Sequence, residues 1–107
     1  MQTIDRDALK EKIDGREDMT LIEVLGPESY ADYHLPGAIN IPAGADNFDE
    51  RAQAAARKDD QVIVYCKDEE CDASPRAGRR LEELGFTNVL DYEAGKEDWR
   101  AAGLPTE

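Results

Sequence analysis

The sequence predicts an α/β domain whose mostly parallel sheet is covered by helices on both faces. Short apolar, β-branched segments alternate with helical segments along the whole chain, which is the order that a parallel sheet requires. The segment QVIVY at 61–65 has three β-branched residues in succession, which is typical of a strand buried on both faces. A chain of 107 residues has the size of one domain, and we expect a single domain over 1–107.

The first part of the chain predicts a helix and a strand. Asp5 can accept a hydrogen bond from an unpaired amide, so we expect a helix over 6–14, with Gly15 ending it in the left-handed conformation. The segment 20–24, TLIEV, is short, mostly apolar and rich in β-formers, and a Gly-Pro pair follows it. These features predict a buried strand.

The middle of the chain predicts short elements joined by turns. We expect a helical turn over 28–33, a turn at 34–38 (HLPGA) because this segment contains Pro and Gly, and a brief strand at 39–41. A helix over 48–58 follows, which Asp46 or Asn47 can cap.

The last part of the chain predicts a helix, a strand and a closing helix. Ser74 can cap a helix and proline is tolerated at its first position, which places the helix over 75–84. The segment 88–91, NVLD, follows as a strand. The closing helix spans 96–102, with Trp99 turned inward.

Composition excludes several classes of partner. The chain has 25 Asp and Glu against 13 Lys and Arg, a net charge of −12, so nucleic acid and anionic membrane surfaces repel it. No apolar run approaches the roughly 18–20 residues that span a bilayer, and the first residues contain no apolar signal core. We therefore expect a cytoplasmic protein without nucleic-acid or membrane partners.

Both cysteines lie in the loop after the central strand. In parallel sheets, ligands gather beyond the carboxyl ends of the strands, and this loop also runs into a helix N-terminus, where unpaired amides favour an anion. A thiolate of Cys66, at the strand end, would be stabilised there as a nucleophile. The alternative is that Cys66 is a small buried apolar residue.

The second cysteine leaves three further readings open. Cys71 is the second candidate nucleophile, being nearer the helix, or it forms a reversible disulfide with Cys66 as a resolving thiol. A zinc site is weakly supported because the one histidine, His34, lies far away in the sequence, so we expect no metal or cofactor. Four residues separate Cys71 from Arg76, which misses the register of cysteine-dependent phosphatases.

The stretches 21–42 and 62–105 resemble the rhodanese domain. The resemblance rests on the run H-x-x-G-A-x-N-I-P from His34 to Pro42, on Cys66 at the strand end, and on the spaced Gly, Phe, Val, Tyr and Trp residues that follow it. It implies a rhodanese-like three-layer fold with a five-stranded, mostly parallel sheet flanked by helices on both faces. It also implies a sulfurtransferase that carries sulfane sulfur as a persulfide and passes it to a thiol or cyanide acceptor.

Carried over residue by residue, the resemblance assigns several roles. Cys66 matches the nucleophile, Ser74 the cap of the helix that closes the loop, and His34 a histidine whose role is mainly structural. Backbone amides of the loop would hold the substrate. They belong to Lys67, Asp68, Glu69, Glu70, Cys71, Asp72, Ala73 and Ser74.

The chain departs from the family pattern around this loop. The loop is two residues longer than usual, and both common arginines are missing, with Leu25 and Ala73 in their places. One lysine against four carboxylates gives residues 67–72 a net charge of −3, which disfavours a thiolate and repels a dianion such as thiosulfate unless these acids point into water.

We therefore expect the sulfur to come from a small persulfide donor or a persulfide-carrying protein. The alternative function is a non-catalytic binding or thiol redox-sensing module that uses the Cys66/Cys71 pair.

Overall fold

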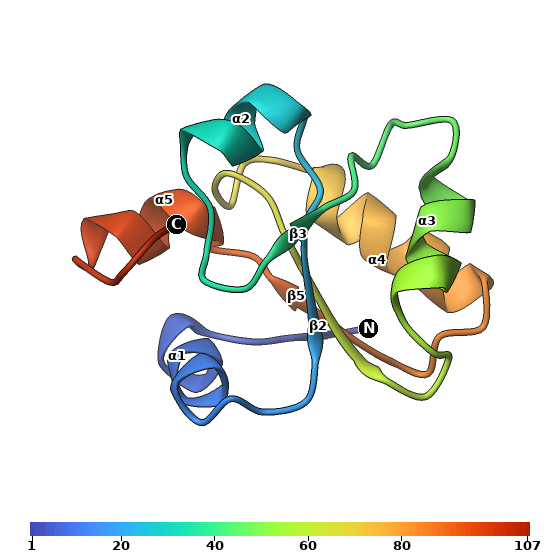
Figure 1. Cartoon of the computed structure of the whole chain (residues 1–107), viewed down its shortest axis with the longest axis horizontal. Helices are drawn as coiled ribbons and strands as arrows, with labels where there is room; N and C mark the ends of the chain where they lie inside the picture. The colour runs from blue at the N-terminus through green and yellow to red at the C-terminus, as the bar shows by residue number, and fades with distance from the viewer.

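The computed structural model describes residues 1–107 and contains one parallel sheet with the strand order β1-β5-β4-β2-β3 (Figure 1). The strands are β1 (Gln2–Thr3), β2 (Thr20–Glu23), β3 (Ile39–Asn40), β4 (Gln61–Tyr65) and β5 (Asn88–Tyr92). The helices are α1 (Arg6–Asp14), α2 (Pro27–Asp32), α3 (Phe48–Ala55), α4 (Ala73–Glu83) and α5 (Gly95–Ala101). All strand pairs are parallel, so the predicted α/β class is confirmed.

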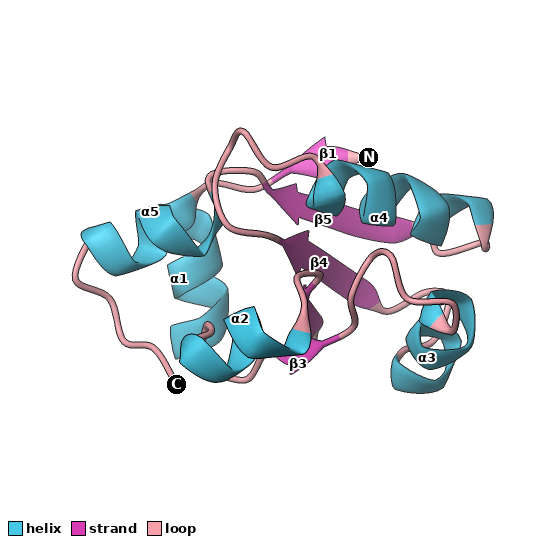
Figure 2. Ribbon diagram, turned by 90° about the horizontal axis from the view of Figure 1, so that it is seen from above, coloured by secondary structure: helices cyan, strands magenta, loops and turns pink.

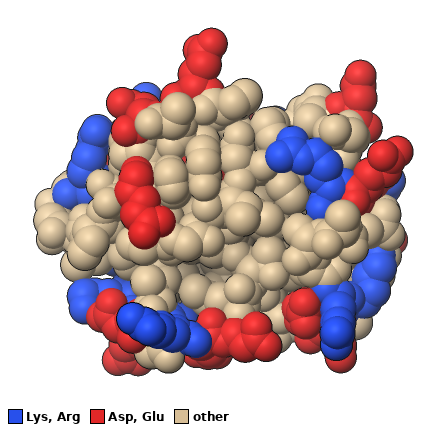
Figure 3. Space-filling view, viewed as in Figure 1, with Lys and Arg blue, Asp and Glu red and all other residues tan.

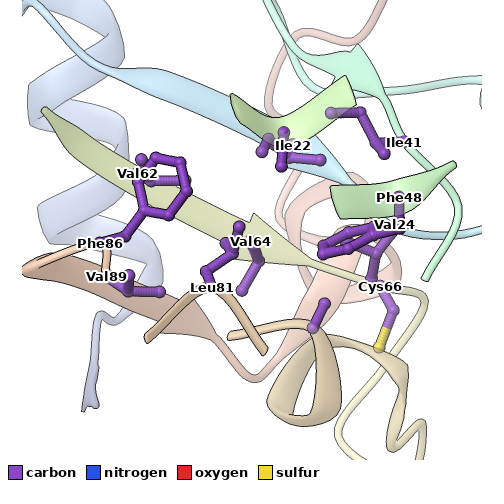
Figure 4. Close-up of a cluster of buried hydrophobic side chains, with 12 residues drawn as sticks. Ile22, Val24, Ile41, Phe48, Val62, Val64, Cys66, Leu81, Phe86 and Val89 are labelled. Carbon is purple, nitrogen blue, oxygen red and sulfur yellow. The ribbon is translucent and has the colours of Figure 1, made fainter. Parts of the chain in front are cut away.

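Helices cover both faces of the sheet, and each face has its own apolar core (Figure 2). One cluster of 12 buried residues joins the sheet to α3 and α4, and Cys66 belongs to it (Figure 4). A second cluster of 8 buried residues joins the other face to α1 and α5, with Trp99 inward as expected. Burial of such side chains contributes roughly 1.5–3 kcal/mol each, so these two cores hold the three layers together.

Strand β4 lies in the middle of the sheet and has no solvent-exposed side chain after its first residue. Val62, Ile63, Val64 and Tyr65 are each 0% exposed. The period of two along a strand sends Val62 and Val64 to the first cluster and Ile63 and Tyr65 to the second. The prediction of a central, doubly buried strand is therefore confirmed.

The starts and ends of some elements differ from the sequence predictions. Asp5 caps α1 as expected by accepting a 2.8 Å bond from the Ala8 amide, but the left-handed residue after this helix is Arg16 (φ 51°), and Gly15 stays in the right-handed region. Strand β1 was not expected because it has only two residues, both exposed. The predicted helix 48–58 ends three residues early, at Ala55.

The start of α4 corrects the predicted role of Ser74. The helix begins at Ala73, with Asp72 at the cap position, and not at Pro75. Ser74 is buried inside the first turn because its hydroxyl interacts with Cys66, an option that local capping rules do not include.

A buried ion pair ties α5 to the carboxyl end of the sheet. The Lys96 ammonium is 2% exposed and lies 3.2 Å from the Glu23 carboxylate, which is fully buried. Lys96 also donates to the carbonyl oxygens of Ser29 and Tyr33, at 2.7 Å each, and the Tyr65 hydroxyl donates to Glu23 at 3.0 Å. This network fixes α2, β2 and α5 around the end of β4.

Charged side chains gather at the rim of the face shown in Figure 3 and leave its centre uncharged. Acidic and basic groups lie interspersed along this rim. Among the exposed ion pairs of the protein is that of Arg80 with Asp49. No helix is both long and apolar enough to cross a membrane.

Candidate active site

The first turn of α5 holds the backbone of the cysteine that follows β4 and of the residue after it. The Lys96 amide donates to the Cys66 carbonyl at 3.0 Å, and the Glu97 amide donates to the Lys67 carbonyl at 2.9 Å. Gly95 allows this close approach because it has a positive φ of 77° and because a side chain there would collide with the backbone of Lys67. The start of the loop is therefore fixed by the closing helix.

The Cys66 sulfur lies at the edge of the first apolar cluster, beside the first turns of α4 (Figure 4). The residue is 1% exposed. Its thiol lies 3.4 Å from the Ser74 hydroxyl oxygen and 3.5 Å from the Cys71 carbonyl oxygen, and it can donate to either. The sulfur thus has polar partners on one side and hydrocarbon on the other.

Burial raises the pKa of the Cys66 thiol to about 11. The neighbouring Cys71 side chain raises this pKa further, whereas the hydroxyl and backbone amide of Ser74 lower it. Desolvation disfavours the thiolate more than these two donors favour it, so the resting group is a neutral thiol.

Some loop amides have partners other than the sulfur. The Asp68 carboxylate accepts from the amides of Glu70 (3.1 Å) and Cys71 (3.2 Å), and the Cys71 amide also meets the Asp68 carbonyl at 3.2 Å. The backbone amide that lowers the pKa of Cys66 is that of Ser74, in the first turn of α4.

The acidic side chains of the loop are mostly in water. Glu69, Glu70 and Asp72 are exposed, and Asp72 faces the guanidinium of Arg76 at 3.4 Å. Asp68 is half-buried through its bonds within the loop. Solvent screens the exposed charges, which weakens their effect on the thiol.

The second cysteine lies beside the first. Cys71 is a half-buried free thiol packed against the same apolar cluster as Cys66. The structure therefore brings Cys66, Cys71 and Ser74 together, as their loop positions suggest.

His34 has other partners. Its ring stacks on Tyr30 with centroids 3.8 Å apart, its Nδ1 meets the Tyr30 carbonyl at 2.9 Å, and its backbone pairs with Glu107. This is a structural role. No group of three or more His, Cys, Asp or Glu side chains is arranged to hold a metal ion.

None of the four surface hollows reaches the cysteines. The hollows measure about 150 to 320 Å³, and their lining residues do not include Cys66, Cys71 or Ser74. With Cys66 only 1% exposed, none of these hollows gives a reagent direct access to its sulfur.

A carboxylate that sequence analysis missed lies next to this group. Asp91 of β5 is 2% exposed; burial raises its pKa, and the Ser74 hydroxyl lowers it. The alternation along β5 places Asp91 on the same face as Val89, toward α4, which is the one signal in the sequence that indicates its orientation.

Known proteins share this fold. The family model of the rhodanese-like domain matches residues 5–102. The chain belongs to the rhodanese-like family. The match covers all five helices and four of the five strands, so the rhodanese-like three-layer fold inferred from the sequence is confirmed.

Relatives of this rhodanese-like domain include enzymes and a regulator. It is 33% identical over 95 residues to thiosulfate sulfurtransferase 16 of Arabidopsis thaliana, with 80% of this chain and 78% of that protein covered. It is 36% identical over 90 residues to an HTH-type transcriptional regulator of Mycobacterium tuberculosis, with 84% of this chain covered. The chain spans 38% of the length of that regulator and 49% of the length of a Bacillus subtilis relative.

A solved rhodanese-like domain from Anabaena superposes with a TM-score of 0.86 at 28% identity, covering 100% of this chain and 79% of that one.

Proposed function

We propose that this rhodanese-like domain is a sulfurtransferase that carries sulfane sulfur on Cys66. The observation that carries the proposal is the position of the Cys66 sulfur at the end of β4, next to the Ser74 hydroxyl and amide in the first turn of α4. A thiolate or persulfide anion formed there would gain these two donors and the positive end of the α4 dipole. Sulfurtransferases among the relatives support the same chemistry.

The reaction divides into two substitutions at sulfur. In the first, the Cys66 thiolate attacks the outer sulfur of a persulfide donor, R–S–SH. The bond between the two donor sulfurs breaks, its electron pair leaves with R–S⁻, and Cys66–S–SH is formed. In the second, an acceptor thiolate attacks the outer sulfur, and the Cys66 thiolate is the leaving group. The two steps return the protein to its starting state without an external oxidant or reductant.

The donor in this proposal is a persulfide on a small thiol or a protein. The net charge of −12 and the acidic loop disfavour the approach of the thiosulfate dianion. Persulfide donors carry less charge at the reacting end, and a protein donor can open the loop 67–72 by binding to it.

Mass spectrometry after incubation with a low-molecular-weight persulfide tests the proposal. Trypsin separates the two thiols, because Cys66 falls in the peptide 59–67 and Cys71 in the peptide 68–76. We expect a gain of one sulfur, about 32 Da, on the peptide 59–67 of the wild type and of Cys71→Ser. Absence of this adduct, or an adduct only on the peptide 68–76, rejects Cys66 as the sulfur carrier.

A second candidate function is a thiol redox sensor that uses the Cys66/Cys71 pair. The packing of both cysteines against one apolar cluster favours it, and a transcriptional regulator among the relatives is compatible with a non-catalytic role. Titration of free thiols before and after mild peroxide distinguishes the two. Loss of two thiols with no sulfur transfer supports the sensor, and two free thiols after oxidation count against it.

A further inference from the structure

A buried carboxylate without a complete set of partners lies on the strand next to β4. Asp91 is 2% exposed, and its Oδ1 is the one buried side-chain oxygen or nitrogen that has no hydrogen-bond partner. Leaving a charged oxygen unsatisfied in the protein interior is costly, so such an atom calls for an explanation in function.

The surroundings of Asp91 contain few charges. Burial raises its pKa above the ordinary aspartate value. Arg79 of α4 lowers this pKa and Glu93, which follows β5, raises it, but both are exposed. Its cross-strand neighbours, Thr3 of β1 and Val64 of β4, carry no titratable side chain.

The Ser74 hydroxyl connects Asp91 to the cysteine. Its oxygen lies 3.4 Å from the Cys66 sulfur, where it accepts from the thiol, and the same hydroxyl lowers the pKa of Asp91, which is the effect of a donor on a carboxylate. One hydroxyl can accept on one side and donate on the other. The three side chains thus form a chain from thiol to carboxylate.

We propose that Asp91 is a positioning residue that takes up the Cys66 proton through Ser74, and this role deepens the proposed sulfur transfer and rests on it. The Cys66 S–H proton moves to the Ser74 oxygen as the Ser74 hydroxyl proton moves to Asp91. No oxidation state changes. The proton stays on Asp91 while Cys66 holds sulfur, and it returns by the same route when the Cys66 thiolate is released.

The need for this route follows from the state of the thiol. With a pKa of about 11, only about one Cys66 in 10⁴ is a thiolate at pH 7. The Glu70 and Cys71 amides bond to Asp68 and not to the sulfur. An internal acceptor offsets this deficit, as general bases do for other buried nucleophiles.

The rate of alkylation of Cys66 by iodoacetamide, measured from about pH 6 to about pH 11 on the peptide 59–67, tests the route. We expect Asp91→Asn to slow alkylation about 10²-fold at pH 7, and the two rates to converge toward pH 11, where hydroxide removes the proton directly. Ser74→Ala should show the same loss, and the double variant no additional loss.

The controls separate this role from a structural one. Glu93→Gln removes an exposed carboxylate near Asp91 and should alkylate like the wild type. A rate that falls equally at every pH would indicate a structural role and overturn the proposal. An unchanged or faster rate for Asp91→Asn at pH 7 would also overturn it, since the carboxylate would then only repel the thiolate.

The alkylation rates can be measured whether or not the protein transfers sulfur. If Cys66 gains sulfur but Asp91→Asn leaves the pH profile of alkylation unchanged, the proton route fails and the sulfurtransferase proposal stands. If the profile changes and no sulfur adduct forms, the sulfurtransferase proposal fails alone.

Discussion

Replacing Gly95 with alanine should disturb the loop that bears Cys66 from a position outside that loop. Gly95 has a φ of 77°, a conformation that costs other residues roughly 1–2 kcal/mol. The added Cβ would also lie 2.6 Å from the Asp68 amide nitrogen and nearer still to the Lys67 carbonyl group. Both obstacles are backbone, so the loop must shift, which adds about 1–3 kcal/mol.

Gly95→Ala is therefore expected to lower the free energy of unfolding by about 2–5 kcal/mol, a large part of the roughly 5–15 kcal/mol that stabilises a typical domain. Gly103 provides a matched control because its φ is 76° and nothing lies within 4 Å of an added Cβ. Gly103→Ala should lose only the conformational part, about 1–2 kcal/mol.

Urea unfolding measures the free energy lost by each variant, provided that the m-value stays equal to that of the wild type. Alkylation of Cys66 in the same proteins reports the displacement of the loop, and we expect it to change for Gly95→Ala alone. Equal losses for Gly95→Ala and Gly103→Ala would refute the argument that the loop packs on Gly95.

Three other predictions concern the buried polar groups and use urea unfolding. Lys96→Met should cost about 3–5 kcal/mol because the Glu23 carboxylate stays buried without its partner, and adding Glu23→Leu should recover most of the loss. Tyr65→Phe should cost about 1–3 kcal/mol, since the Leu35 amide and Glu23 both lose the hydroxyl. The raised pKa of Asp91 means that the folded state prefers the protonated form, so wild-type stability falls as the pH rises from 3.8 through the folded pKa. Asp91→Asn should therefore be more stable than the wild type at pH 7, and this gain should vanish at pH 3.8 and below; a loss at pH 7 would contradict the sign.

Elements with a strong local signal were predictable from the sequence. Strand β4 matches its predicted range of 61–65, because a run of β-branched residues has no good alternative to a buried strand. Helix α1 matches 6–14, because the Asp5 cap and the apolar spacing agree. The two-residue β1 carries too little sequence for any pattern, and pairing with β5 defines it.

The chemistry of the site was only partly accessible to sequence reasoning. Adjacency of Cys66, Cys71 and Ser74 follows from one short loop, which a sequence displays directly. The contact of Asp91 with Ser74 and the ion pair of Lys96 with Glu23 depend on the order of strands in the sheet, and the second pair is 73 positions apart. Local rules also predicted Ser74 as a helix cap, whereas its hydroxyl is the hydrogen-bond partner of the Cys66 sulfur. Capping and bonding to sulfur use the same hydroxyl, so the sequence does not distinguish them.

Because the amides of α5 hold the carbonyls of Cys66 and of the residue after it, the position of the sulfur depends on residues about thirty positions further along the chain. Substitutions in the first turn of α5 offer a way to change the reactivity of the Cys66 thiol without substituting any residue of the loop. Likewise, a ligand or protein that tilts α5 would alter the thiol's reactivity without touching it.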